Sequence, residues 1–140
     1  MSSRFTVATH VLTLLASSDG EALTSAYIAS SVNTNAVVIR RLLGLLRKAR
    51  LVRSHPGPGG GWHLARSART ITLRDVYRAS GEAGVFAMHA STPNPRCPVG
   101  ANIQPILSGH FDDAQRALEE ELERTSVESL LGQVRERAAP

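Results

Sequence analysis

The stretch from Asn33 to Arg66 constrains the fold of this chain more than any other part of the sequence. It begins with a basic run whose apolar residues recur at the i, i+3, i+4, i+7 spacing of one buried helical stripe: Ile39, Leu42, Leu43 and Leu46. Thr34 is the expected cap of this helix, with Asn33 as the competing cap. Glycine and proline then fill positions 56–61 between two short apolar runs, which is typical of a hairpin tip. A basic helix followed by a glycine-tipped hairpin predicts a winged helix-turn-helix.

Two more helices are expected ahead of the basic helix. An apolar stripe predicts the first one, from about Arg4 to Ser17, through Phe5, Ala8, Leu12 and Leu15. Thr24 can cap a second, short helix over 25–32, in which Ile28 and Val32 face inward. Three helices with a short turn between the second and third, followed by a hairpin, have the element order of a winged helix.

The chain beyond the hairpin is expected to be helical at its ends and irregular in between. Thr72 and Asp75 form a capping box that opens a short helix to about Ala79. The segment 80–96 has no steady period and contains several glycines and prolines, so a mostly irregular connection is expected there.

A long helix and a final shorter helix are expected after this connection. Pro98 suits the first position of the long helix, because its missing N–H is not needed there, while Pro105 indicates a kink or a later start. Residues 125–128 read as a second capping box that starts the final helix.

Charge and composition limit the class of protein. Residues 1–78 hold 11 Lys/Arg and 3 Asp/Glu, or +8, whereas residues 79–140 hold 5 and 9, or −4, and together these give the net charge of +4. This asymmetry favours a nucleic-acid-binding domain joined to a protein-binding segment, with a chance distribution of surface charge as the alternative. No run of eighteen apolar residues or signal peptide is present, and a single cysteine excludes an internal disulfide, so we expect a cytoplasmic protein without a membrane partner.

The most specific pattern lies around the hairpin. Leu46-Arg47-Lys48 and Leu51-Val52 precede Gly57-x-Gly59-Gly60-Gly61-Trp62-x-Leu64-Ala65, and Ile71 to Val76 continue the match. On these residues the chain resembles the Rrf-type winged-helix transcriptional regulators, the family of the IscR and NsrR repressors. The resemblance implies a mainly α fold with a small β-hairpin. It divides the chain into a winged helix-turn-helix domain (1–79), a connecting or sensor loop (80–98) and dimerisation helices (99–140). It also implies a sequence-specific dimeric regulator of double-stranded DNA, most simply a repressor.

The resemblance implies which residues face DNA. Those opening the basic helix would face the major groove: Asn35, Val37, Val38, Arg40 and Arg41. Arginine suits guanine, asparagine suits adenine and valine suits the thymine methyl group. Solvated charges are the alternative for the two arginines, and partial burial in the core for the two valines. Thr24 and Ser25 are candidates for phosphate contacts at a helix N-terminus.

The hairpin departs from the family pattern. Many members carry an arginine before the first wing glycine, whereas Pro56 stands at that position here. His55 could still reach DNA, and the glycines at 57, 59 and 60 (Gly57, Gly59 and Gly60) would permit a tight turn close to phosphate. A merely tight hairpin is the alternative, and Trp62 is expected to pack beneath the wing.

The long helix carries an apolar stripe for which a second copy of the chain is the expected partner. Its dimerisation residues would be Leu107, Phe111, Ala114, Leu118 and Leu122. In the alternative, the helix folds back on its own domain as core.

Cys97 is the expected sensor. Cluster-binding relatives use three closely spaced cysteines, whereas this region holds one, so no metal site or other cofactor is expected. The alternative is a non-standard iron–sulfur cluster in which His89, His110 or acidic residues supply the other ligands. Cys97 stands at a helix N-terminus beside Arg96, which favours the thiolate, so oxidation or modification could switch the protein. A buried, inert cysteine is the alternative.

Three other interpretations stay open. A small ligand could bind between Tyr77, the irregular segment and the long helix, against Phe86, Met88 and His89. The winged helix could serve protein contacts alone. A thiol-dependent enzyme would need Cys97 with a base such as His89 or His110, but no nucleophile motif, phosphate loop or paired metal-ligand motif occurs, so we expect no enzyme.

Overall fold

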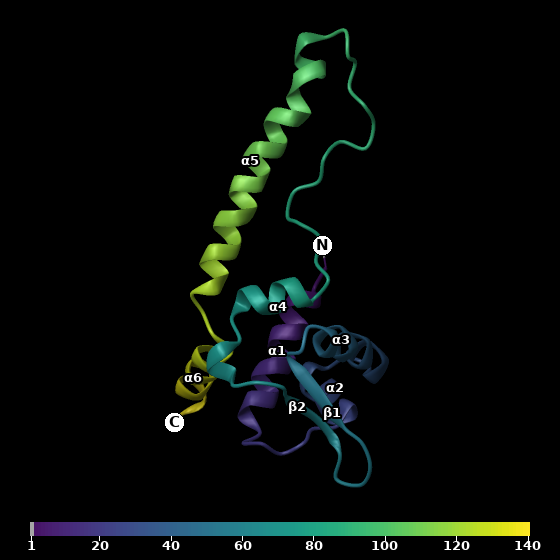
Figure 1. Cartoon of the computed structure of the whole chain (residues 1–140). Coiled ribbons are helices and arrows are strands. Elements are labelled where there is room, and N and C mark those ends of the chain that lie inside the picture. The colour runs from purple at the N-terminus through teal and green to yellow at the C-terminus, as the bar shows by residue number, and fades with distance from the viewer. Residues whose placement is uncertain (1) are drawn as a thin grey trace. The chain divides into compact units, whose positions relative to one another are not determined.

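The computed structural model describes residues 2–140, which form two compact units. The first unit consists of the described residues up to Glu82 together with Leu122–Pro140, and the second is Ala83–Glu121. Figure 1 follows the chain through α1 (Arg4–Ser17), α2 (Ser25–Val32), α3 (Ala36–Lys48), β1 (Val52–His55), β2 (Gly61–Leu64), the 3-10 turn η1 (Ala68–Thr70), α4 (Leu73–Ala79), α5 (Pro98–Glu123) and α6 (Val127–Ala138). The predicted mainly α fold with one β-hairpin is confirmed.

The core of the first unit is aliphatic and comes from every helix of that unit. The predicted stripe of α3 is buried in full, and α1 contributes Ala8, Leu12 and Leu15 as expected, together with Val11. Burying this apolar surface is the main term that holds the three helices together. The core also includes Val127 of α6, which is fully buried.

The turn between α2 and α3 differs from the prediction at its cap. Asn33 ends α2 in the left-handed conformation (φ 62°, ψ 49°), a region that asparagine tolerates better than most residues. Asn35 caps α3, with its Oδ1 accepting from the backbone N–H groups of Val37 (2.8 Å) and Val38 (3.2 Å). The predicted Thr34 cap is wrong because Asn33 and Thr34 are needed to reverse the chain, so α3 begins only at Ala36.

The predicted hairpin is confirmed as the wing. Its strands pair antiparallel, with Val52 opposite Leu64 and His55 opposite Gly61. Leu23 extends this sheet by a bridge to Trp62, in which each backbone N–H donates to the other's carbonyl (2.8 and 3.1 Å). Trp62 is half-buried and packs against the core, which ties the base of the wing to the loop before α2.

The segments before α4 and α6 lie side by side. The predicted capping box of α4 is confirmed, because the Thr72 hydroxyl accepts from Asp75 N (3.2 Å) and the Asp75 carboxylate accepts from Thr72 N (3.0 Å). Leu73 N donates to Thr125 O (2.9 Å), and Val127 N donates to Ile71 O (2.8 Å).

The final helix differs from the prediction in its cap and its packing. Ser126 caps α6 by accepting from Ser129 N (3.0 Å), so the predicted capping box at residues 125–128 is wrong. We expected this helix among the dimerisation helices of 99–140. In the structure α6 packs against α1 and places Val127 and Leu131 in buried positions.

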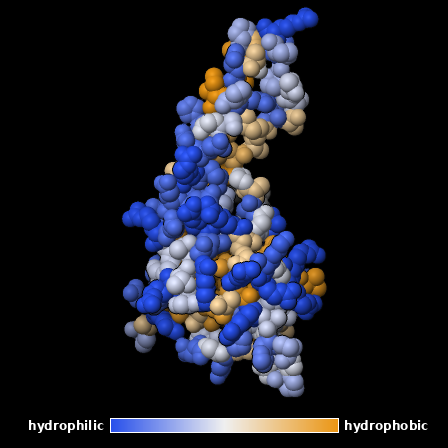
Figure 2. Space-filling model, viewed as in Figure 1, coloured by the Kyte–Doolittle hydropathy of each residue, from blue (hydrophilic) through white to orange (hydrophobic). Residues whose placement is uncertain are grey.

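The second unit consists of an irregular segment and most of α5. The helix begins at Pro98, as predicted, and continues past Pro105, so the alternative of a later start is wrong. Pro105 cannot donate the usual backbone hydrogen bond. Phe86 of the irregular segment stacks on Phe111, with ring centroids 4.7 Å apart, and Val85 N donates to Gln115 Oε1 (3.0 Å). No described residue of α5 is buried, and Figure 2 shows apolar atoms at the surface of this part of the chain.

Candidate nucleic-acid interface

The helix α3 separates its buried stripe from an exposed face that is both basic and apolar. Val37 is 54% and Val38 is 45% exposed, and Arg40 and Arg41 are exposed beside them. This exposure argues against the alternative that the two valines belong to the core. Guanidinium donors and small apolar groups on one helical face match the edges of guanine and the methyl group of thymine.

Asn35 is the N-cap of α3, at the start of this exposed face. Its Oδ1 already accepts two backbone hydrogen bonds, so the side-chain NH₂ is left to donate. A bidentate pair with adenine needs the oxygen as well as the NH₂. Asn35 can therefore donate to a base or phosphate without disturbing the cap, but a bidentate contact would require the cap to open.

The N-terminus of α2 presents a second group of polar side chains. Thr24 caps the helix by accepting from Tyr27 N (3.1 Å), and Ser25 is half-buried in the first turn. Tyr27 itself is 57% exposed, and the sequence analysis did not single it out. A phenol that stands clear of the core at a helix N-terminus can donate to a phosphate oxygen.

The wing turn is shaped by glycine. Gly57 and Gly59 have φ values of 90° and 72°, and Gly60 N donates to Gly57 O (2.9 Å). A Cβ at Gly60 would collide with the carbonyl oxygen of His55, so this position excludes any side chain. The glycines therefore build the tight turn that was expected.

The wing carries an arginine, Arg53, that the sequence analysis did not single out. Arg53 pairs with His63 across the two strands, and the rings of His55 and His63 lie 6.4 Å apart. Alternation along the strands could have indicated this, because positions 53 and 55 are on the face opposite Val52. The wing thus holds a guanidinium although Pro56 replaces the arginine typical of the family.

Cys97 lies outside this surface, just before α5. It is exposed, which excludes the buried, inert alternative. Hydrogen bonds from the backbone N–H groups of Gly100 and Val99 lower the pKa of its thiol from the ordinary value of 9.0. Donors to the charged form stabilise the thiolate.

The donors of this chain do not fit a metal centre. Within residues 2–140, no three His, Cys, Asp or Glu side chains come together at a spacing that could hold a metal ion. Cys97 is the chain's one cysteine, and a cluster needs several thiolates or imidazoles. A cluster held by the residues of one chain is therefore not supported.

The groove expected to bind a small ligand is present, but only two of the four expected residues line it. Met88 and His89 line an open groove of the second unit, against Leu107 and Phe111 of α5. Tyr77 does not line it, because Tyr77 is buried in the first unit, edge-to-face against the Phe5 ring at 5.4 Å. Phe86 stacks on Phe111 rather than lining the groove.

The predicted dimerisation residues are all available for a contact. Ala114 is exposed, and Leu107, Phe111, Leu118 and Leu122 are only partly covered within their own chain. A helix of 26 residues without a buried side chain is unusual for a folded protein in isolation. Its role in dimerisation stays a prediction.

Comparison with known proteins identifies the family. The Rrf2 family, described as "Iron-dependent Transcriptional regulator", matches residues 1–133. The chain belongs to the Rrf2 family of transcriptional regulators. It is 42% identical over 132 residues to YwnA of Bacillus subtilis (strain 168), which bears the name of an HTH-type transcriptional regulator; the alignment covers 94% of this chain and 96% of YwnA.

Solved structures agree with the fold of this Rrf2-family regulator. A crystal structure described as that of a DNA-binding protein matches with a TM-score of 0.74 and 40% identity, over 91% of this chain and 98% of the other. The IscR structure from T. potens matches with a TM-score of 0.75 and 20% identity, over 100% and 91% of the two chains. The second likeness supports the winged-helix fold alone. No helix within residues 2–140 has both the length and the apolar character needed to cross a membrane.

Proposed function

We propose that this Rrf2-family regulator is a cytoplasmic homodimeric repressor that reads double-stranded DNA with α3 and contacts the flanking backbone with its wing. The observation that carries the proposal is the exposed face of α3, where Val37, Val38, Arg40 and Arg41 stand over a fully buried stripe. Repression follows if the occupied operator overlaps a promoter. The same surface would serve DNA far better than an acidic protein surface, because it combines cations with small apolar groups.

Salt-dependent binding tests this proposal. The pure protein would be titrated against labelled DNA from upstream of its own gene, by fluorescence anisotropy at several salt concentrations. A steep fall of affinity with salt is expected, because phosphate contacts release counterions. Arg40→Gln should weaken binding by about tenfold or more, the loss expected for one guanine contact of roughly 1–3 kcal/mol. Arg135→Gln, an exposed arginine of α6, is the matched control. Weak binding that does not depend on salt would favour a winged helix used for protein contacts.

We propose that two copies associate through α5. The apolar stripe on this helix supports the proposal, because none of its side chains is buried and the irregular segment covers Leu107 and Phe111 only in part. Leu118→Glu should shift the protein from dimer to monomer in sedimentation velocity, while Glu120→Gln should leave the dimer unchanged. A dimer that survives Leu118→Glu with unchanged affinity would exclude this interface.

We propose that Cys97 switches the regulator, and that no resident cluster is needed. Its exposure and lowered thiol pKa support oxidation by a peroxide. The thiolate attacks one peroxide oxygen and breaks the O–O bond, which gives a sulfenic acid and hydroxide. Condensation with the thiol of the partner subunit's Cys97 then forms a disulfide with loss of water. Peroxide should then lower the DNA affinity of the native protein but not that of Cys97→Ser. Equal responses of the two proteins, or an iron and sulfide content that tracks DNA binding, would contradict the thiol switch.

A further inference from the structure

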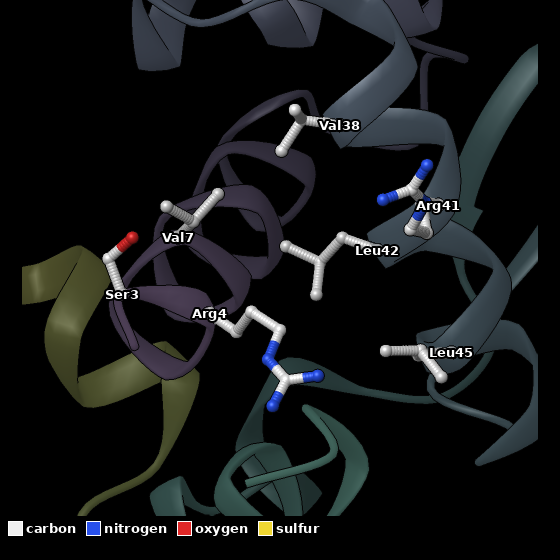
Figure 3. Close-up of a pocket in the computed structure, with 7 residues that line it drawn as sticks. All are labelled: Ser3, Arg4, Val7, Val38, Arg41, Leu42 and Leu45. Atoms are coloured by element: carbon white, nitrogen blue, oxygen red, sulfur yellow. The ribbon is translucent and has the colours of Figure 1, made fainter. Parts of the chain in front are cut away.

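A small cavity lies between the start of α1 and the exposed part of α3. It has a volume of about 190 Å³ and is lined by Ser3, Arg4, Val7, Val38, Arg41, Leu42 and Leu45. Figure 3 shows Arg4 and Val7 coming from α1, Ser3 from the position just before it, and the other four side chains from α3. The cavity is therefore built in part from the helix that is proposed to read DNA.

The walls of this cavity are aliphatic and its polar groups are cationic. Val7, Leu42 and Leu45 are at least half-buried and give it an apolar wall. In the view of Figure 3, the guanidinium groups of Arg4 and Arg41 lie on opposite sides of Leu42. An apolar cavity with a few convergent polar groups is the usual form of a small-molecule site.

Neither guanidinium is neutralised by the protein. Arg4 donates from Nη2 to Gly81 O (3.1 Å) and from Nε to Ser2 Oγ (3.2 Å). Neither of these hydrogen bonds uses Nη1 of Arg4. Within residues 2–140, neither Arg4 nor Arg41 forms an ion pair with a carboxylate. Two cations beside an apolar wall lack the anion that would complete the site.

We propose that this cavity binds a small monocarboxylic acid with an apolar body. The carboxylate would accept from the Arg41 guanidinium, the positive charge of Arg4 on the other side of Leu42 would add to its attraction, and the apolar body would lie against Val7, Leu42 and Leu45. The volume restricts the acid's size, because 190 Å³ is below the roughly 300–1,000 Å³ of pockets that hold drug-sized ligands. This corresponds to a short branched or monocyclic acid, not to a long acyl chain or a nucleotide.

The bound acid would act as an effector of DNA binding. This step rests on the proposed function, because it requires Arg41 to contact DNA. A carboxylate that holds the Arg41 guanidinium withdraws it from a base or phosphate, and it also cancels positive charge on the DNA-facing helix. Acid and DNA therefore compete, and each lowers the affinity of the other by the same factor.

Direct binding of a probe tests the site without DNA. Benzoate would be titrated into the full-length protein and followed by ¹H–¹⁵N NMR shifts, with benzamide as a neutral analogue of the same shape. Saturable shifts centred on the residues that line the cavity are expected for benzoate, with benzamide at least about tenfold weaker. Arg41→Gln should weaken benzoate by about tenfold, since a charge-assisted hydrogen bond is lost, and Arg4→Gln should weaken it by a smaller factor, since a nearby positive charge is lost. Arg135→Gln should bind benzoate as the native protein does. Equal binding of benzoate and benzamide, or shifts confined to other parts of the chain, would overturn the proposal.

A competition experiment then tests the effector role. Benzoate should lower the DNA affinity of the native protein, and Arg4→Gln, while it still binds DNA, should need a higher benzoate concentration for the same loss of affinity. If the native protein does not bind DNA at all, the proposed function fails, yet the NMR titration still decides on the carboxylate site. If benzoate binds but leaves DNA affinity unchanged, the effector role is overturned. Val7→Phe, which fills the cavity from α1, should abolish benzoate binding in a protein whose NMR spectrum shows it to be folded. A native dimer whose cavity residues are covered by the partner subunit, and which binds no benzoate, would also contradict the site.

Discussion

The guanidinium carbon of Arg47 lies 5.8 Å from the centroid of the Trp62 ring, so the last turn of α3 meets the first residues of β2. A cation over an indole face is attracted by the ring's quadrupole. The contact joins two elements that are both expected to touch DNA, and the bridge from Trp62 to Leu23 joins them in turn to the loop before α2. Trp62 therefore sets the position of the wing relative to α3.

Removing this ring should loosen the wing. We expect Trp62→Ala to lower the free energy of unfolding by about 2 kcal/mol, less than the roughly 3–5 kcal/mol lost at fully buried aromatic sites, because Trp62 is half-buried. Urea denaturation followed by circular dichroism measures this loss. Trp62 is the chain's only tryptophan, so Arg47→Gln should also change the intrinsic fluorescence of the folded protein, while Lys48→Gln should not. An unchanged stability in Trp62→Ala would show that the ring does not anchor the wing.

Asn35 allows helix capping and DNA contact to be separated. Asn35→Ala should cost about 1 kcal/mol of stability, because two backbone N–H groups lose their acceptor. Asn35→Asp keeps the acceptor and suits the helix dipole, so stability should remain, but the added negative charge should weaken DNA binding. Thermal denaturation and anisotropy titrations of the two variants give both quantities. Equal DNA affinity of Asn35→Asp and the native protein would exclude Asn35 from the interface.

The last helix should contribute to the stability of the winged-helix unit. Val127→Ala should lower the free energy of unfolding by about 2 kcal/mol, since it removes two fully buried methyl groups and leaves a cavity. Val134→Ala, on the same helix but 53% exposed, should cost less than about 0.5 kcal/mol and serves as the matched control. Both values come from urea denaturation at fixed protein concentration. Equal effects of the two substitutions would place α6 outside the core.

Cys97 should react at a lower pH in the folded protein than in the unfolded chain. Its thiol pKa is lowered from 9.0 by the backbone N–H groups of Gly100 and Val99, so the thiolate is populated at a lower pH than usual. The rate of alkylation by iodoacetamide, measured against pH, should therefore have its midpoint below 9.0 in the native protein and return to the ordinary value in concentrated urea. In linkage terms, the depressed pKa adds stability above the unfolded value, and this is lost as pH falls through the folded value. The same midpoint in both states would contradict this account of Cys97.

The sequence predicted the elements that depend on local patterns. The apolar period of α3, the capping box at Thr72 and Asp75, and the glycine-rich turn all follow from rules that act over a few residues, and each was confirmed. The exposed face of α3 could be predicted for the same reason, because burial of its stripe fixes which side chains remain outside.

The features that were missed depend on contacts between distant segments or on competition between neighbouring residues. Thr34, Asn33 and Asn35 can all cap a helix, and only the length of the turn decides among them. The placement of α6 depends on a backbone pairing between Thr72 and Ser126, and no local sequence pattern predicts a pairing of residues so far apart in the chain. The cavity beside Arg4 needs two helices, α1 and α3, between which another helix intervenes in the sequence, so it could be found only once the fold was known.

The chain leaves the winged-helix unit after Glu82 and returns to it at Leu122. The paired segments around Thr72 and Ser126 hold the outgoing and returning parts of the chain close together. The 39 residues of Ala83–Glu121 are therefore an insertion into an otherwise continuous domain. A segment inserted into a host domain can change while the host keeps its own core. The residues between these two boundaries can therefore diverge in sequence or length without loss of the core that Val127 completes.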